Sequence, residues 1–196
     1  MTFSNRFSKK VWMTIIAAVL VIALGAWYFN ADQKIKTVVV NGNYLVYETV
    51  EDLQAASELV VIATPTGKQK SVVTGSGMSK NGWMLTEIRI DKVIKPDEKQ
   101  EIKEGMTVSI TEPYYIADAG IEPGKVMVIP EEYTAVQAGN QYVLFLSWDG
   151  RSKTYGVYTG PQGKFNIDGR DVNEDEQLEG ANADLKQQVL AKYSGR

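Results

Sequence analysis

The chain has 196 residues, with 21 Lys and Arg, 24 Asp and Glu, and a formal net charge of -3. It contains no His and no Cys, which excludes His- or Cys-dependent nucleophiles, Cys/His zinc sites, thiol redox chemistry and disulfides. The length suits one domain, and the lack of a basic excess argues against nucleic acid as a partner.

An uncharged apolar segment, residues 11–29, is the first element along the chain. As a helix rising about 1.5 Å per residue, it would span about 28 Å, close to the ~30 Å of a hydrocarbon core. Trp12 lies near one end and Trp27 and Tyr28 near the other, as aromatic residues do at membrane interfaces. We therefore expect a single transmembrane signal anchor whose partner is the lipid bilayer.

Basic residues determine the expected orientation in the cell membrane. Arg6, Lys9 and Lys10 precede the segment without any acid, so residues 1–10 should form a cytoplasmic tail and the remainder should be extracytoplasmic. A cleaved secretory signal, with residues 23–25 as a small-x-small site, and a buried core helix are the alternatives. Because bulky aromatic residues continue the apolar segment past that site, the sequence favours an uncleaved anchor.

Residues 30–36 form a short linker, and residues 37–172 contain the turn signals of a β domain. Asn-Gly and Asp-Gly pairs favour tight turns with positive φ and predict three hairpins here. Their strands would be residues 37–40 with 43–47, 141–148 with 151–158, and 164–167 with 170–172.

Hydrophobic periodicity predicts further strands. They cover residues 59–63, 83–94, 106–111 and 126–129. Within the second of these, Ile88, Ile90 and Ile94 are predicted to share one buried face. Residues 141–148 are apolar on both faces, so we expect a central strand there.

Two helices complete the predicted elements. Thr49 with an acid three residues later predicts a helix N-terminus, and this helix would end near Ser57. Residues 173–196 would form an acidic linker and a C-terminal amphipathic helix, with the acid-rich stretch 170–180 exposed. The C-terminal helix would begin at Asn182 or Asp184 and bury Leu185, Val189 and Tyr193.

Many short antiparallel strands with one early and one C-terminal helix predict a mainly β fold after the transmembrane helix. The first choice is a small OB-like, Greek-key barrel, and the alternative is a sandwich. A closed barrel would also remove exposed strand edges.

A long segment with Pro, Gly and acids surrounds the short strand 126–129, and long loops in compact domains are often functional. The ligand-binding candidates are Tyr114, Tyr115, Glu131, Glu132 and Tyr133. Aromatic residues there could stack on sugar rings or peptide, although core packing explains most tyrosines of the chain equally well.

Asp171, Asn173 and Asp175 alternate like the first three ligands of a calcium loop. However, Glu176 occupies the position that needs Gly, and Asn182 the position that needs a bidentate Glu. The sequence therefore predicts no cofactor, with calcium at these three residues as the alternative.

No motif predicts catalytic residues. The chain has no S-x-x-K sequence, P-loop or dinucleotide fingerprint. Glu131 and Glu132 are adjacent, so on a strand their carboxylates would point to opposite faces rather than form a dyad.

The order of elements over residues 47–167 resembles that of small membrane-anchored or lipoprotein-type extracytoplasmic proteins of Gram-positive bacteria. The stretches that carry this resemblance are Thr49–Asp52, Leu59–Ala63, Asp91–Lys95, Lys103–Val108, Ala138–Leu146 and Gly160–Phe165. The resemblance implies an extracytoplasmic location and a β-barrel-like domain, but it implies no binding or catalytic residue. This chain differs in its anchor, since some of those proteins use a lipid-modified Cys.

These observations predict an anchored extracytoplasmic domain that binds a protein or a cell-wall polymer. An envelope enzyme dependent on carboxylates or a metal, and an accessory subunit of a membrane complex, are the alternatives. The external part would keep 18 basic and all 24 acidic residues, a net charge of -6. Attraction to anionic lipid or nucleic acid is therefore not expected.

Overall fold

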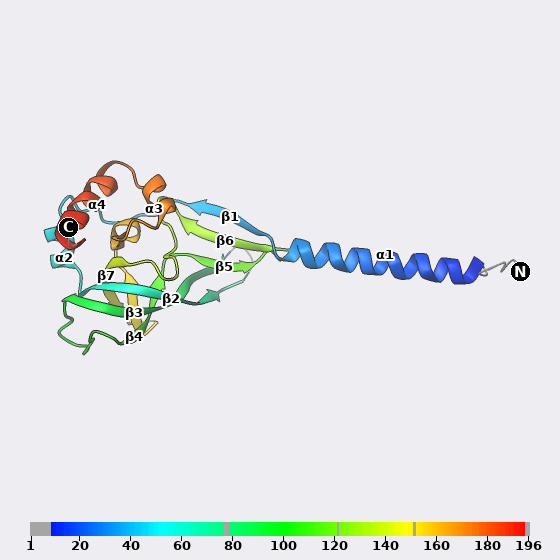
Figure 1. The fold of residues 1–196 in the computed structure, drawn as a ribbon, viewed down its shortest axis with the longest axis horizontal. Helices are drawn as coiled ribbons and strands as arrows, with labels where there is room; N and C mark the ends of the chain where they lie inside the picture. The colour runs from blue at the N-terminus through cyan, green and yellow to red at the C-terminus, as the bar shows by residue number, and fades with distance from the viewer. Residues whose placement is uncertain (1–8, 77–78, 121, 151, 195–196) are drawn as a thin grey trace, which may run out of the picture. The chain divides into compact units, whose positions relative to one another are not determined.

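The computed structural model describes residues 9–76, 79–120, 122–150 and 152–194 (Figure 1). The fold is mainly β, with one N-terminal apolar helix and a C-terminal helix, as the sequence predicts. The chain divides into two compact units, residues 1–36 with 118–126, and residues 37–117 with 127–196.

Helix α1, Lys9–Asp32, dominates the first unit. Its residues from Val11 onward are long and apolar enough to cross a membrane by length and composition. None of that span is buried in the structure, which does not fit the alternative of a core helix.

The end of α1 is fastened to the segment 118–126 of the same unit. The Gly124 N–H donates to a carboxylate oxygen of Asp32 at 3.2 Å, and the Lys125 N–H donates to the Lys34 carbonyl at 2.8 Å. Lys36 and Glu122 form an exposed ion pair at 3.5 Å. The chain after the helix is therefore held by backbone pairing rather than left as a free linker.

Nine strands are described. They are β1 Ile35–Val40, β2 Leu59–Thr74, β3 Asn81–Lys95, β4 Thr107–Glu112, β5 Tyr115–Asp118, β6 Lys125–Pro130, β7 Tyr142–Asp149, β8 Thr154–Val157 and β9 Lys164–Asn166. A three-stranded sheet has the order β1–β6–β5, and a six-stranded sheet has the order β2–β3–β4–β8–β7–β9.

The six-stranded sheet has one further pairing, between β2 and β7. Pairings therefore lead from β2 through β3, β4, β8 and β7 back to β2. All are antiparallel except β4 with β8, which is parallel. Strand β7 pairs with β2, β8 and β9, which confirms the predicted central strand.

Strand β2 continues far beyond the predicted residues 59–63, through Pro65 and Gly67. The pairing register with β3 shifts between Pro65 and Gln69, and Gly67 has a φ of 88°. An irregularity of this kind accommodates a proline and a glycine that would otherwise end a strand.

Two more register shifts lie between Val60 and Val61 and between Ile62 and Ala63. They change which face of the sheet each following residue of β3 occupies. Ile90 packs inside the sheet with Ile88, whereas Ile94 packs with a second cluster. The prediction that Ile94 shares their face is therefore wrong, because simple alternation does not continue across a bulge.

The core consists of three clusters. The first is formed mainly by β2, β3, β4 and β7 and includes Leu59, Val61, Ile88, Ile110 and Leu144. The second packs the other face of β2 and β7 against helices and includes Leu53, Val60, Phe145, Phe165, Leu185 and Val189. The third is smaller and contains Met84, Tyr114, Ile129 and Tyr133.

Helix α2, Val50–Ala56, has the predicted cap, since the Thr49 hydroxyl accepts the Asp52 N–H at 3.1 Å. Helix α4, Gly180–Tyr193, buries Leu185 and Val189 as predicted. It begins after Glu179, however, so the predicted caps at Asn182 and Asp184 are wrong.

Two predicted hairpins are absent from the described residues. Strand β1 pairs with β6 rather than with residues 43–47, and the chain after β9 enters helix α3, Val172–Gln177. The predicted hairpin of residues 141–148 with 151–158 is confirmed as β7–β8, with its register closing at Asp149 and Thr154. A 3-10 helix, Gly160–Gly163, leads from β8 into β9.

Candidate binding groove

A groove with a volume of about 660 Å³ is lined in part by the three-stranded sheet. Its floor comes from β1 and β6, its walls from residues 130–137 and from α3 with the chain that follows. The lining residues are Thr37, Val39, Met127, Ile129, Pro130, Glu131, Glu132, Tyr133, Thr134, Ala135, Gln137, Asn173, Glu176, Gln177 and Glu179. Alternation explains the floor, because Thr37 with Val39 and Met127 with Ile129 are each two residues apart on a strand.

The groove is acidic at its walls and apolar at its floor. Glu131, Glu132, Glu176 and Glu179 are all exposed, and the described lining contains no Lys or Arg. The groove therefore presents negative charge around an apolar surface.

Glu132 has a φ of 60°, in the left-handed region that non-glycine residues rarely occupy. Its carboxylate accepts a hydrogen bond from the Asn182 amide of α4. This contact holds the wall segment to the C-terminal helix.

Tyr133 is part of the groove lining but is almost fully buried, with only 1% of the residue exposed. Its hydroxyl donates to Glu112 at 2.9 Å, and burial raises the pKa of the Tyr133 phenol. Glu112 also accepts from the Val136 N–H at 3.0 Å and from the Thr86 hydroxyl. Burial raises the pKa of the Glu112 carboxyl, although these donors and the charge of Lys164 act in the opposite direction.

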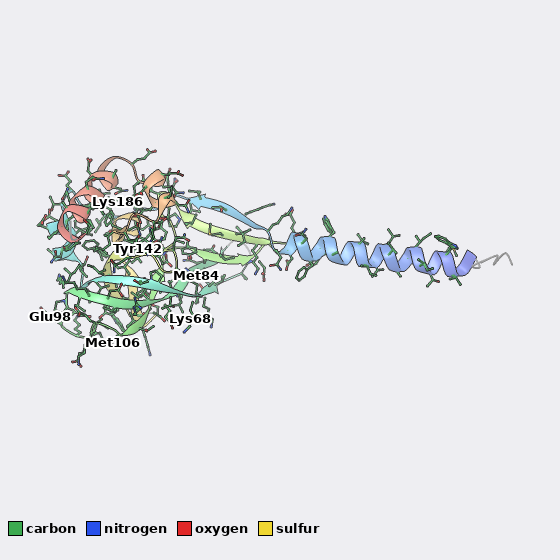
Figure 2. All side chains as sticks on the ribbon, in the orientation of Figure 1. Lys68, Met84, Glu98, Met106, Tyr142 and Lys186 are labelled. Carbon is green, nitrogen blue, oxygen red and sulfur yellow. The ribbon has the colours of Figure 1, made fainter. Side chains whose placement is uncertain are left out.

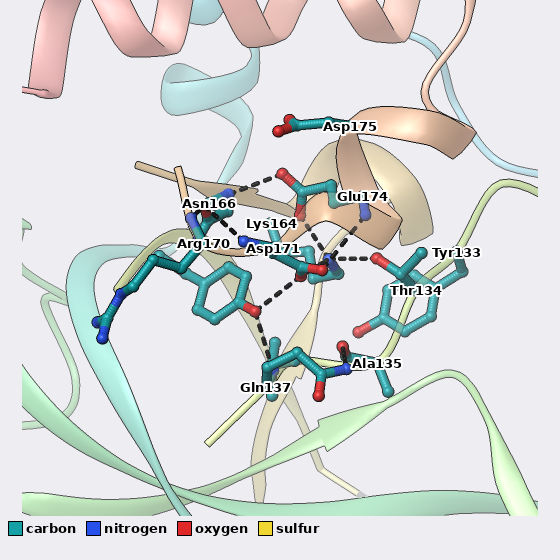
Figure 3. A network of polar contacts seen from close by, with 12 residues as sticks. Tyr133, Thr134, Ala135, Gln137, Lys164, Asn166, Arg170, Asp171, Glu174 and Asp175 are labelled. Atoms are coloured by element: carbon teal, nitrogen blue, oxygen red, sulfur yellow. Dashed lines mark hydrogen bonds and ion pairs between the residues drawn. The ribbon is translucent and has the colours of Figure 1, made fainter. Parts of the chain in front are cut away.

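A buried polar cluster fixes helix α3 behind the groove (Figure 3). Lys164 of β9 donates to the Thr134 hydroxyl at 2.8 Å and to Glu174 of α3 at 2.5 Å. Glu174 also accepts from Lys186 of α4 at 2.8 Å. One carboxylate thus joins a strand and two helices, and buried ion pairs of this kind favour one arrangement of the elements.

The structure brings three of the five predicted ligand-binding residues, Glu131, Glu132 and Tyr133, into the groove. Tyr114 is not in the lining; it is buried against the Tyr133 ring, with centroids 6.3 Å apart, and desolvation raises its pKa. Tyr115 is also outside the lining, and its hydroxyl donates to the Lys80 carbonyl at 3.2 Å.

The three predicted calcium ligands have separate surroundings. Asp171 is buried and caps α3, Asn173 lines the groove, and Asp175 pairs with Lys186. In the part of the chain that the structure describes, no group of three or more acids could hold a metal ion.

Sequence reasoning missed Glu176, Gln177 and Glu179 as groove residues. It also predicted an exposed acidic linker, which is wrong for Asp171 and Glu174, since both are buried. The acidic composition was visible, but the lysines that allow burial come from β9 and α4, outside that stretch. No local signal reports such partners.

The sequence matches no known family model, and no curated protein matches it significantly.

Proposed function

We propose that this chain is a single-pass membrane protein whose β domain lies outside the cytoplasm and binds a ligand in the groove. The ligand would be a cationic segment with an apolar surface, belonging to an envelope protein or a cell-wall polymer. The observation that carries this proposal is the combination of an apolar floor with four exposed glutamates and, among the described lining residues, no lysine or arginine.

Charge complementarity supports a cationic ligand. A cleft lined by one sign of charge concentrates ligands of the opposite sign and speeds their association. Val39, Met127 and Ile129 would supply the apolar contact between the charged walls. Because the groove is lined partly by Glu131 and Glu132, this proposal retains the site predicted from the sequence.

The strand pairings support a small OB-like barrel for the β domain. They run β2–β3–β4–β8–β7 and return to β2. The pair β4–β8 is the single parallel pair among them. OB-type barrels hold five strands in this closed Greek-key order and commonly serve as ligand-binding modules. A sandwich would leave the β2–β7 pairing without an explanation.

Fluorescence anisotropy with the detergent-solubilised full chain tests the groove. The probe is a labelled peptide of alternating Lys and Val, and its counterpart of alternating Glu and Val is the ligand control. We expect binding of the basic peptide, weakened about 5- to 20-fold by Glu131→Gln with Glu176→Gln, since each lost pair contributes up to about 1 kcal/mol.

Glu98→Gln is the matched protein control, because Glu98 is an exposed acid outside the groove lining (Figure 2). It should leave binding unchanged. Equal binding of the acidic peptide, or equal binding by the double variant, would contradict the proposed ligand class.

A further inference from the structure

A buried amine lies between two buried carboxyls in the cluster behind the groove. The Lys164 and Glu174 side chains are each 2% exposed, and that of Asp171 is fully buried. The Lys164 Nζ lies 2.5 Å from Glu174 Oε2 and 4.0 Å from Asp171 Oδ2 (Figure 3). Three reactive groups are therefore held together without access to bulk water.

Aromatic rings complete the surroundings of the amine. The Nζ lies 5.6 Å from the ring centroid of Tyr133 and 5.3 Å from that of Tyr142. Keeping both an ammonium and a carboxylate charged in such a place carries a large desolvation cost. A reaction that removes both charges would be favoured by this enclosure.

The Asp171 carboxyl is arranged to accept a nucleophile. Oδ2 receives the Tyr142 hydroxyl at 2.8 Å, and Oδ1 receives the Glu174 N–H at 3.3 Å. Hydrogen-bond donors on both oxygens stabilise the negative charge that develops when a carboxyl carbon is attacked. The capping role of Asp171 on α3 fixes this orientation.

The Glu174 carboxylate is placed to take the proton from the amine. It contacts Nζ directly, while Lys186 at 2.8 Å and the Asn166 N–H at 2.8 Å hold its other oxygen. Proton transfer by a positioned carboxylate needs this hydrogen-bond contact.

We propose that the chain forms an intramolecular amide bond between Lys164 Nζ and Asp171 Cγ, with Glu174 transferring the protons. Glu174 removes a proton from the ammonium, the amine attacks Cγ, the C–N bond forms, and one C–O bond breaks. The two protons lost by nitrogen leave on the departing oxygen as water. Ammonium plus carboxylate gives amide plus water, so no oxidant, reductant or cofactor is required.

Proximity makes this condensation possible in a folded chain. Well-oriented intramolecular reactions reach effective concentrations of about 10⁵ M or more. The product would tie β9 to the start of α3, the helix that forms one wall of the groove. In a chain without cysteine, it would be a covalent cross-link that needs no thiol.

Mass spectrometry of the purified full chain tests the bond. Trypsin should leave the backbone uncut after Lys164 and give a branched peptide, residues 154–170 joined to residues 171–186, one water lighter than the sum of its parts. Fragmentation within the branch should place the linkage on Asp171 rather than on Glu174. Separate, unmodified peptides ending at Lys164 and beginning at Asp171 would overturn the proposal.

Variants test the assigned roles. Asp171→Asn should still form the bond, but with loss of ammonia instead of water. Glu174→Gln should remain unlinked while its circular dichroism spectrum stays that of the folded protein. Lys164→Arg is the unlinked reference. Full linkage in Glu174→Gln would show that Glu174 does not transfer the protons.

Discussion

At the residue scale, Glu112 is a buried acid whose side chain accepts hydrogen bonds from three donors. Two of them, the Tyr133 hydroxyl and the Val136 N–H, belong to the segment that forms the groove. The third is the Thr86 hydroxyl of β3, so this carboxyl joins the sheet to the groove wall. Loss of a carboxyl here would leave buried donors without an acceptor.

Glu112→Ala should lower the free energy of unfolding by about 2–4 kcal/mol, because at least two buried donors lose their partner. Glu112→Gln keeps an acceptor oxygen and should cost about 1 kcal/mol or less. Denaturant unfolding of the full chain in detergent, followed by tryptophan fluorescence, measures both. Equal losses for the two variants would contradict a hydrogen-bonding role.

The same carboxyl gives a pH dependence of stability. Its folded pKa is raised above the ordinary value of 4.5, so the folded state retains the proton more strongly than the unfolded state. The stability that it contributes is complete below pH 4.5 and is lost as pH rises through the folded pKa. The stability of Glu112→Gln relative to the native protein should therefore increase as pH rises above 4.5. A difference that stays constant with pH would contradict the raised pKa.

Residues whose role depends on distant partners could not be predicted from the sequence. Lys164 and Glu174 are charged, and sequence alone favours their exposure. Their burial follows from the meeting of β9, α3 and α4, which are joined through one carboxylate. Glu131 and Glu132, in contrast, are ligand-binding candidates from the sequence, because the unusual composition of their loop is local.

At the element scale, the sequence predicts correctly those helical features that depend on residues close together in the chain. The cap at Thr49 and the spacing of Leu185 and Val189 each lie within a few residues, and both helices are found, although α4 begins before its predicted start. Strand β1 shows the opposite case. Asn41-Gly42 favours a tight turn, yet β1 pairs with β6, whose residues follow much later in the chain. The backbone pairing of the whole strand with β6 therefore outweighs the local turn propensity.

Helix α4 stabilises the domain through its buried face, and one substitution on each face tests this. Leu185→Ala should lower the free energy of unfolding by about 2–5 kcal/mol, because Leu185 is fully buried in the second cluster. Gln187→Ala, at an exposed position of the same helix, should change it by less than about 0.5 kcal/mol. Denaturant unfolding of the full chain measures both variants. If both substitutions changed the free energy of unfolding only slightly, α4 would not stabilise the β domain.

At the scale of the whole molecule, orientation across the membrane decides which ligands can reach the groove. Helix α1 has the length and composition of a membrane span. Arg6, Lys9 and Lys10 before the apolar segment outnumber Lys34 and Lys36 immediately after it. Since basic residues near a span favour the cytoplasmic side, we expect the β domain to be external.

Protease accessibility of a C-terminally tagged full chain in intact cells measures this orientation. We expect digestion from outside, with the undigested band at full length, since the sequence favours an uncleaved anchor. Replacing Arg6, Lys9 and Lys10 by Gln leaves Lys34 and Lys36 as the basic residues nearest the span, so a fraction of the chains should become protected. Complete protection of the native chain until lysis would place the β domain in the cytoplasm. The groove would then have to recognise an intracellular cation, and an envelope ligand would be excluded.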